Sequence, residues 1–299
     1  MALTLQGYVD LPSHTGGGFD HGDVDQTTGR VFTAHTANGT VEILDGVNLT
    51  HVATLPGCPE ASGVLCVQAP RLAFAAARGA GKVLLVDSAS PAIQREFTVG
   101  PKPNGLAWDA ARHRLLVADV GAYQARIFAL DGALVATTAL SGRPRWCVYD
   151  RTRDRFLINV REPAVVDVLA ATTGERVASI PIPVAGPHGL DLDEEARQAF
   201  VACDGGAVVR LDLVADRAEG STPIDGEPDA IWLNRAQRRL YVAIGKPGVV
   251  DVVDTAGLAV VEQVPTEEGA PTTAFDPVRQ RLYVFLPRSC RAVVYLEGE

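Results

Sequence analysis

Residues 105–109 read Gly-Leu-Ala-Trp-Asp, and residues 114–119, after a short polar turn, read Arg-Leu-Leu-Val-Ala-Asp. Both runs are apolar, and both are bounded by glycine, aspartate or other polar residues. Short apolar runs that end at turn-forming residues are typical of β-strands, because a helix needs a longer uninterrupted segment. The two runs therefore predict a pair of adjacent antiparallel strands.

The same pair of runs recurs along the chain. The second run often reads Arg-Leu-Tyr-Val, as in residues 239–242 and 281–284. The residue five before the position of the closing aspartate falls at 20, 62, 104, 145, 188, 229 and 271, in steps of 42, 42, 41, 43, 41 and 42. Such regular spacing indicates one structural unit written seven times.

Two more strands complete each unit. A third run appears at residues 41–45, 83–87, 208–212 and 250–254, and a fourth as in residues 51–55 and 260–264. Four short strands in about 42 residues are typical of a β-propeller blade. The seventh unit stops after its third strand, so we expect residues 3–9 to supply the fourth. Length alone suggests two domains, but the repeat predicts an all-β, single seven-bladed propeller domain over residues 1–299.

These repeats also resemble a known family. The tracts 20–25, 29–35 and 38–45 are similar to the YVTN-type (YncE-like) propeller repeats, which commonly read Leu-Tyr-Val-Ala-Asn followed by Val-x-Val-Ile-Asp. Residues 240–243 and 282–284 match the first part of that pattern. The resemblance covers the whole chain and implies the propeller fold. Because it is a likeness of fold, it implies no catalytic residues.

Composition excludes several classes of protein. The chain has 27 basic and 36 acidic residues, so its net charge is 27 − 36 = −9, which argues against a nucleic-acid partner. A hydrophobic content of 47% excludes a disordered chain. No run of 18 apolar residues is present and the start lacks a signal-like segment, so we expect no membrane partner and a cytoplasmic location.

The five cysteines are scattered, without a Cys-x-x-Cys pair. We expect reduced thiols, with a Cys58–Cys66 disulfide as the alternative.

The propeller architecture predicts where a ligand binds. In each blade the first strand lines the central channel, and its start lies on the same face as the end of the antiparallel second strand. We therefore expect an axial funnel at that face that binds a small molecule. The positions that map to its rim are unusually polar; they include Asp20, His21, Ser62, Asn104, Arg145, His188, Asp229, Thr272, His35, Arg78, Asp119, Arg161, Asp204 and Lys246.

Histidines and aspartates on this rim suggest a metal. Imidazole and carboxylate groups are ligands that Zn, Mn, Fe and Ni accept. The predicted ligands of a divalent metal ion, whose identity the sequence does not specify, are His14, His21, His35, His188 and Asp20. The alternative is that these side chains bind neighbouring backbone groups or line a water-filled channel.

Two arginines in blade 4 suggest an anionic ligand. Arg145 and Arg161 form a fork that is suited to a carboxylate or phosphate. The predicted substrate-binding residues are Asn104, Asp119, Arg145, Arg161, Asp204 and Thr272. The alternative is that the arginines simply pair with rim aspartates such as Asp119 and Asp20.

Three functions follow from these patterns. The first is binding of a small molecule, with or without a metal, in the axial funnel. The second is a metal-dependent hydrolase or lyase that acts on a small anionic substrate, with His21, His188, Arg145 and Asp229 as catalytic residues. The third is a non-catalytic scaffold for a protein or peptide, which the low aromatic content of 6% does not favour. The three tryptophans are expected to pack between blades, and the sequence indicates no oligomeric state.

Overall fold

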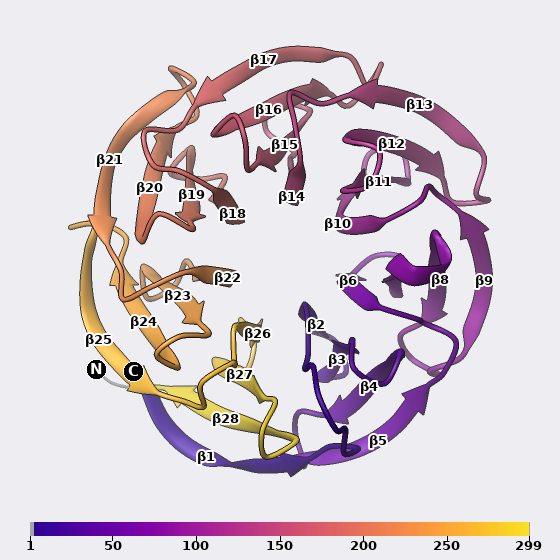
Figure 1. The fold of residues 1–299 in the computed structure, drawn as a ribbon, viewed down its shortest axis with the longest axis vertical. Coiled ribbons are helices and arrows are strands. Elements are labelled where there is room, and N and C mark those ends of the chain that lie inside the picture. The colour runs from indigo at the N-terminus through magenta and orange to yellow at the C-terminus, as the bar shows by residue number, and fades with distance from the viewer. Residues whose placement is uncertain (1–2, 299) are drawn as a thin grey trace.

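Seven four-stranded antiparallel sheets are arranged around a central axis (Figure 1). The computed structural model describes residues 3–298. In six of the sheets the strand order follows the chain, and in the seventh β1 lies beside β28; the sheets meet their neighbours through their innermost strands. The predicted all-β fold, a single seven-bladed propeller, is thus confirmed. Among residues 3–298, no helix is long and apolar enough to cross a membrane.

In the first four blades the strands follow one another from the axis outward. Blade 1 contains β2 (Gly22–Asp25), β3 (Arg30–His35), β4 (Thr40–Asp45) and β5 (Thr50–Leu55). Blade 2 contains β6 (Ala61–Val67), β7 (Leu72–Ala77), β8 (Lys82–Asp87) and β9 (Ile93–Thr98), with a short 3₁₀ turn, η1 (Arg78–Ala80). Blade 3 contains β10 (Pro103–Asp109), β11 (Arg114–Asp119), β12 (Gln124–Ala129) and β13 (Leu134–Ala139). Blade 4 contains β14 (Pro144–Asp150), β15 (Arg155–Val160), β16 (Val165–Ala170) and β17 (Arg176–Pro181).

The other three blades complete the ring. Blade 5 contains β18 (Pro187–Asp193), β19 (Gln198–Cys203), β20 (Ala207–Asp212) and β21 (Arg217–Pro223). Blade 6 contains β22 (Pro228–Asn234), β23 (Arg239–Ile244), β24 (Val249–Asp254) and β25 (Ala259–Pro265). Blade 7 contains β26 (Thr272–Asp276), β27 (Arg281–Leu286), β28 (Arg291–Glu297) and, as its outermost strand, β1 (Leu3–Asp10).

Strand β1 closes the ring. It pairs antiparallel with β28, with Leu3 opposite Glu297 and Asp10 opposite Arg291. The N-terminal strand therefore completes the last blade, as the sequence predicted. An open blade edge would expose unpaired backbone groups, and this arrangement covers the edge of β28 with a strand from the far end of the chain.

The aspartate that ends most first strands shapes the turn that follows. Asp109 Oδ1 accepts hydrogen bonds from the backbone N–H groups of Ala111 (2.9 Å) and Arg112 (3.1 Å). Asp276 Oδ1 does the same for Val278 (2.9 Å) and Arg279 (3.1 Å). A short acidic side chain favours a turn because it replaces the backbone partners that a strand would supply. The recurring aspartate is therefore a turn residue in these blades.

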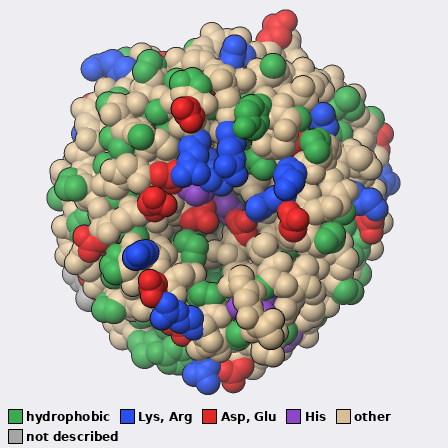
Figure 2. Space-filling view, in the orientation of Figure 1, with side chains coloured by type: hydrophobic (Ala, Val, Ile, Leu, Met, Phe, Trp, Pro, Cys, Tyr) green, Lys and Arg blue, Asp and Glu red, His purple; other side chains and the backbone are tan. Residues whose placement is uncertain are grey.

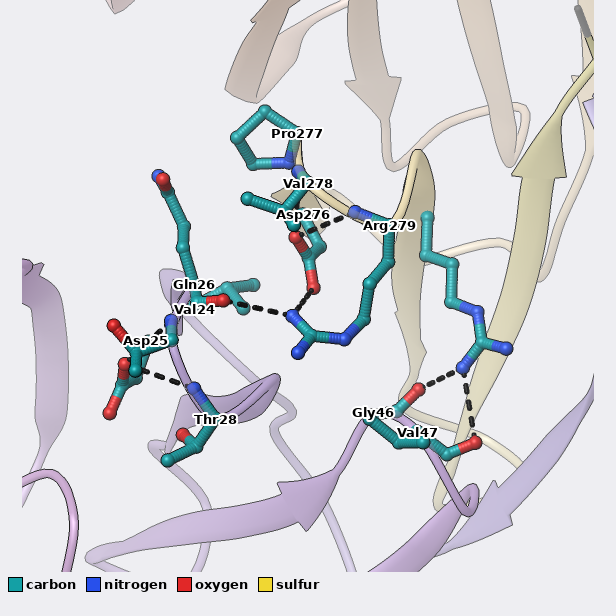
Figure 3. Close-up of polar contacts among 12 residues, drawn as sticks. Val24, Asp25, Gln26, Thr28, Gly46, Val47, Asp276, Pro277, Val278 and Arg279 are labelled. Carbon is teal, nitrogen blue, oxygen red and sulfur yellow. Dashed lines mark hydrogen bonds and ion pairs between the residues drawn. The ribbon is translucent and has the colours of Figure 1, made fainter.

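Arginines in and after these turns fasten each blade to the next. Figure 3 shows the seam between blades 7 and 1, where Arg279 Nη1 donates to Gln26 O at 2.9 Å and also bonds Asp276. Arg281, at the start of β27, donates to the carbonyls of Gly46 and Val47 in blade 1. In the same way Arg155 of blade 4 donates to Leu213 O of blade 5 at 3.2 Å. The arginine that begins many second strands is therefore an inter-blade contact.

The hydrophobic core lies between neighbouring blades. The second strands are almost wholly buried, as in β23, because each sheet is covered on both faces. The outermost strands alternate between exposed and half-buried residues, as in most of β25. All five cysteines are free and four are buried, and burial raises the pKa of Cys58 to about 12. The alternative Cys58–Cys66 disulfide does not form.

Candidate functional site

A cavity of about 440 Å³ lies where the first strands begin, on the axial face predicted for the funnel. In Figure 2, Lys and Arg side chains gather beside a central hollow in which histidine and acidic side chains lie. The wall of the cavity comes from blades 4, 5 and 6 and includes Lys246. The funnel therefore brings together five of the residues predicted as catalytic or substrate-binding, namely Arg145, Arg161, His188, Asp204 and Asp229.

His188 is held between two carboxylates. Its Nδ1 lies 2.8 Å from Asp204 Oδ1, and its Nε2 lies 3.0 Å from Asp229 Oδ1. Burial alone would lower the pKa of His188, but the two carboxylates outweigh it and raise the pKa to about 9. His188 is therefore an imidazolium at neutral pH. In that state it has no lone pair for a metal ion or for a proton, so it acts in this arrangement as a fixed cation.

Asp20, His21 and Arg78 form a second polar cluster, which does not line the funnel cavity. His21 Nδ1 lies 2.6 Å from Asp20 Oδ1, and Arg78 donates to Asp20 Oδ2 at 2.5 Å. Arg78 also donates to Asn104 Oδ1 at 2.9 Å. Burial opposes ionisation of Asp20, but His21 and Arg78 overcome it and lower the pKa of that carboxyl. Asn104, predicted to bind substrate, therefore positions Arg78.

Arg145 differs from the other partly buried charged residues of the funnel wall because it has no ion-pair partner among residues 3–298. Within residues 3–298, its side chain has no hydrogen bond and no carboxylate within ion-pair distance, and its buried Nε lacks a partner. Arg161, by contrast, binds Asp204, with 2.6 Å between Nε and Oδ2. Burial and the nearby Arg143 lower the pKa of Arg145. The alternative that both arginines pair with rim aspartates thus fits Arg161, whereas Asp229 and Asp204 attract Arg145 without forming an ion pair with it.

His14 and His35 lie together, away from His21 and His188. His14 Nδ1 is 2.8 Å from His35 Nε2, and His35 Nδ1 is 3.1 Å from Glu42 Oε1. Phe19 stacks on the His35 ring with 4.4 Å between centroids. This cluster packs the loop before β2 onto blade 1. Glu42 was missed by the sequence reasoning, although its place in β4 between buried residues marks it as an inward-facing acid.

The expected metal ligands therefore do not converge. No group of three or more His, Cys, Asp or Glu side chains among residues 3–298 is arranged to hold a metal ion. Both ring nitrogens of His188 and of His35 are already engaged, and Asp20 is bound to His21 and Arg78. This donor set does not fit a metal centre, and we derive no chemistry through one.

Two predicted substrate-binding residues have structural roles. Asp119 is fully buried and accepts hydrogen bonds from the N–H groups of Lys102 (3.1 Å) and Gly121 (2.9 Å). Thr272 is buried and donates to Phe19 O at 3.1 Å. Neither lines the funnel cavity. Both lie on the face of the propeller that was predicted for the funnel. The Asp119 side chain stabilises a turn, and the Thr272 side chain holds the loop before β2.

Comparisons with known proteins place the fold and leave the function open. No family model matches the chain, and no curated protein matches it in sequence. Among solved structures, a chain of hydrazine synthase from Kuenenia stuttgartiensis is similar with a TM-score of 0.84 and 14% identity, over 96% of this chain and 97% of that one. Identity at this level shows a shared propeller fold alone. The resemblance to YVTN-type repeats stays a prediction that these comparisons do not test.

Proposed function

We propose that this propeller binds a small anionic molecule, a carboxylate or phosphate, in its axial funnel, with Arg145 as the anchoring group. The observation that carries the proposal is the partly buried guanidinium of Arg145, which makes no hydrogen bond or ion pair with residues 3–298 and whose Nε is buried. A buried charge normally has a partner because removing it from water is costly. An anionic ligand would supply that partner, and a guanidinium binds carboxylate or phosphate oxygens through two parallel hydrogen bonds.

The charges around Arg145 support the same assignment. Asp204 and Asp229 are neutralised by His188 and Arg161, and Glu268 pairs with Arg288. Lys246 at the rim has no ion-pair partner among residues 3–298, and Arg143 lies close enough to repel Arg145. One exposed acid, Glu227, opposes them. The unpaired charge of the wall is therefore mainly positive, although the whole chain is acidic.

The test is a binding titration with inorganic phosphate and with succinate at low ionic strength, measured by calorimetry. We expect saturable binding of at least one of the two. Arg145→Ala should weaken it about tenfold or more, since a charge-assisted bidentate contact contributes about 1.5–3 kcal/mol. Arg217→Ala, which removes an exposed arginine on the outer strand β21, is the matched control and should bind as the wild type does. Equal affinity in the Arg145→Ala variant, or binding of neither anion, contradicts the proposal.

Arg145→Lys tests whether the anion is bound through a bidentate guanidinium contact or through positive charge alone. Lysine keeps the charge but cannot make the bidentate contact, so we expect an affinity between those of the wild type and of Arg145→Ala.

Catalysis by the funnel, as a hydrolase or lyase, stays a prediction that no finding tests. Of the histidines predicted as catalytic, His188 is held as an imidazolium, and His21 does not line the funnel cavity. A scaffold role for a protein or peptide is likewise untested and would leave binding of small anions unaffected by Arg145→Ala.

A further inference from the structure

A second cavity lies on the axis at the opposite end of the first strands. It measures about 320 Å³, and its wall includes Trp108, Trp146, Trp232 and Tyr149. These residues follow the funnel residues along the same strands: Arg145 faces the funnel and Trp146 faces this second cavity. We call it the aromatic chamber. All three tryptophans of the chain line it. Each also packs against a hydrophobic cluster between two neighbouring blades, as the sequence predicted.

A pair of stacked rings separates the chamber from the funnel. The His21 ring of blade 1 stacks on the Trp146 ring of blade 4, with 4.0 Å between centroids and 7° between planes. His21 is 6% exposed. Rings from opposite sides of the axis therefore meet between the two cavities, and the two ends of the channel are separate compartments.

Two carboxyl groups line the chamber beside the indole rings. Asp23 and Asp191 occupy equivalent positions in β2 and β18, and both also line an adjoining cavity of about 370 Å³ toward the mouth. Each bonds only backbone N–H groups: Asp23 binds Val24 and Cys66 at 2.7 Å, and Asp191 binds Leu192 at 2.7 Å and Leu233 at 2.8 Å. Neither carboxylate has an ion-pair partner within residues 3–298.

Two arginines lie at the mouth, and one of them is in an ion pair. Arg151 binds Glu194 through its backbone N–H at 2.8 Å and through its guanidinium at 3.4 Å. Arg235 donates to Leu192 O at 2.8 Å. Burial raises the pKa of Asp23 to about 7 and that of Asp191 to about 6, and Asp191 adds to the effect on Asp23. The chamber thus holds two carboxyl groups that form no ion pair among residues 3–298, although Arg235 attracts Asp191 from a longer distance.

One indole donor is also unused. The buried Nε1 of Trp108 has no hydrogen-bond partner within residues 3–298, whereas Trp232 Nε1 donates to Thr273 O at 3.0 Å. A buried donor without a partner costs free energy, which an acceptor on a ligand would remove.

We propose that the aromatic chamber binds an organic cation, an alkylammonium group that also carries a hydrogen-bond acceptor, between the indole rings and the carboxylates of Asp23 and Asp191. The faces of tryptophan rings attract ammonium groups, most strongly where water is excluded. Carboxylates at the same site supply the opposite charge, and the hydroxyl or ester oxygen of the ligand accepts from Trp108 Nε1. This site is independent of the anion site proposed for the funnel.

The probe is choline, and its uncharged isostere 3,3-dimethylbutan-1-ol is the control ligand. Because every tryptophan of the chain lines the chamber, intrinsic fluorescence reports on this site, and calorimetry gives the affinity. Sodium chloride at matched ionic strength corrects for screening. We expect saturable binding of choline, about tenfold or more tighter than that of the isostere. Binding should strengthen from pH 5 to pH 8 as both carboxyls ionise.

Two sets of variants keep the test decisive. Asp23→Asn with Asp191→Asn should weaken choline binding about tenfold or more, while Asp10→Asn with Glu96→Gln removes two exposed carboxylates of the outer strands and should leave it unchanged. If the first pair does not fold, Trp108→Leu removes one ring with both carboxyls intact and should weaken binding several-fold. No saturable response to choline, or equal affinity for the isostere, overturns the proposal.

Discussion

The funnel and the aromatic chamber are built from the same first strands, yet their charges are balanced in opposite ways. In the funnel nearly every buried acid meets a basic group, and one arginine, Arg145, is left over. In the chamber Asp23 and Asp191 bond only backbone N–H groups among residues 3–298, so the carboxyl groups there form no ion pair. The propeller fold therefore determines where a side chain points. The residue type at each position along the first strand determines whether the lining of a compartment carries positive or negative charge.

The largest effect on both compartments should come from opening the ring. Deleting residues 1–10 removes β1 and leaves the edge of β28 unpaired, so blade 7 loses its hold on the rest of the structure. Both compartments depend on the ring, and we expect the protein to lose cooperative unfolding or to melt far below the wild type. Thermal unfolding followed by circular dichroism checks this. Leu5→Ser, which changes an exposed residue of β1, is the control. A deletion variant with a wild-type melting temperature would show that β1 does not close the structure.

The partition between the compartments is the next target. Trp146→Ala removes the ring that stacks on His21. We expect this substitution to connect the two cavities. We expect a loss of about 3 kcal/mol in the free energy of unfolding, at the lower end of the range for aromatic truncations because Trp146 is only partly buried. Urea denaturation measures it. Trp146→Phe keeps an aromatic face toward His21 and should lose about 1 kcal/mol. Equal losses in both variants would mean that the stack has no role of its own.

The pH dependence of stability should differ between the two compartments. The pKa of His188 is raised from 6.5 to about 9 in the folded state. Its stabilising contribution is therefore complete below pH 6.5 and is lost as pH rises through 9; a shift of this size corresponds to about 3 kcal/mol. The pKa values of Asp23 and Asp191 are also raised, to about 7 and about 6, so their protonated forms stabilise the fold at low pH and this contribution is lost as pH rises from 4 to 7.

Variants assign the two changes in stability with pH, the upper step near pH 9 and the lower step from pH 4 to 7, to their residues. In urea titrations from pH 4 to 10, His188→Gln should remove the upper step, and Asp23→Asn with Asp191→Asn should remove the lower one. A variant that removes the step of the other compartment would contradict the assignment of the charges.

The smallest effect on stability should come from Arg145→Ala. Because this guanidinium is partly buried without a partner, its loss should change the free energy of unfolding by less than about 1 kcal/mol, in the stabilising direction. The same variant should lose most of its affinity for anions. Denaturant unfolding without added anion gives the value. A marked destabilisation would show that Arg145 has a structural partner.

The fold could be predicted from the sequence because the propeller repeats one local pattern. The spacing of the closing aspartates, the Arg-Leu-Tyr-Val runs and the missing fourth strand of the seventh unit together define the ring. The position of Arg145 at the start of a first strand also placed it correctly in the funnel. Each of these inferences needs only strand direction and strand order.

The rest of the site could not be predicted for a geometric reason. The first strands of blades 2 to 6 contain register irregularities near their starts, such as the one between Pro144 and Cys147 in β14. A bulge of this kind changes which side chains face the axis, so simple alternation does not place Trp146 in the channel. The pairing of His14 with His35 depends on the loop before β2, whose path no repeat specifies.

The pairing of β1 with β28 has a consequence for how the protein folds during synthesis. Leu3 and Glu297 are 297 − 3 = 294 positions apart, whereas the other neighbouring strands of every blade are joined by short turns. On the ribosome, β1 emerges first and has no partner until the last blade has been made, so the contact of greatest sequence separation forms last. Ring closure therefore depends on synthesis of the seventh blade: a nascent chain that stops before β28 leaves β1 unpaired and the ring open.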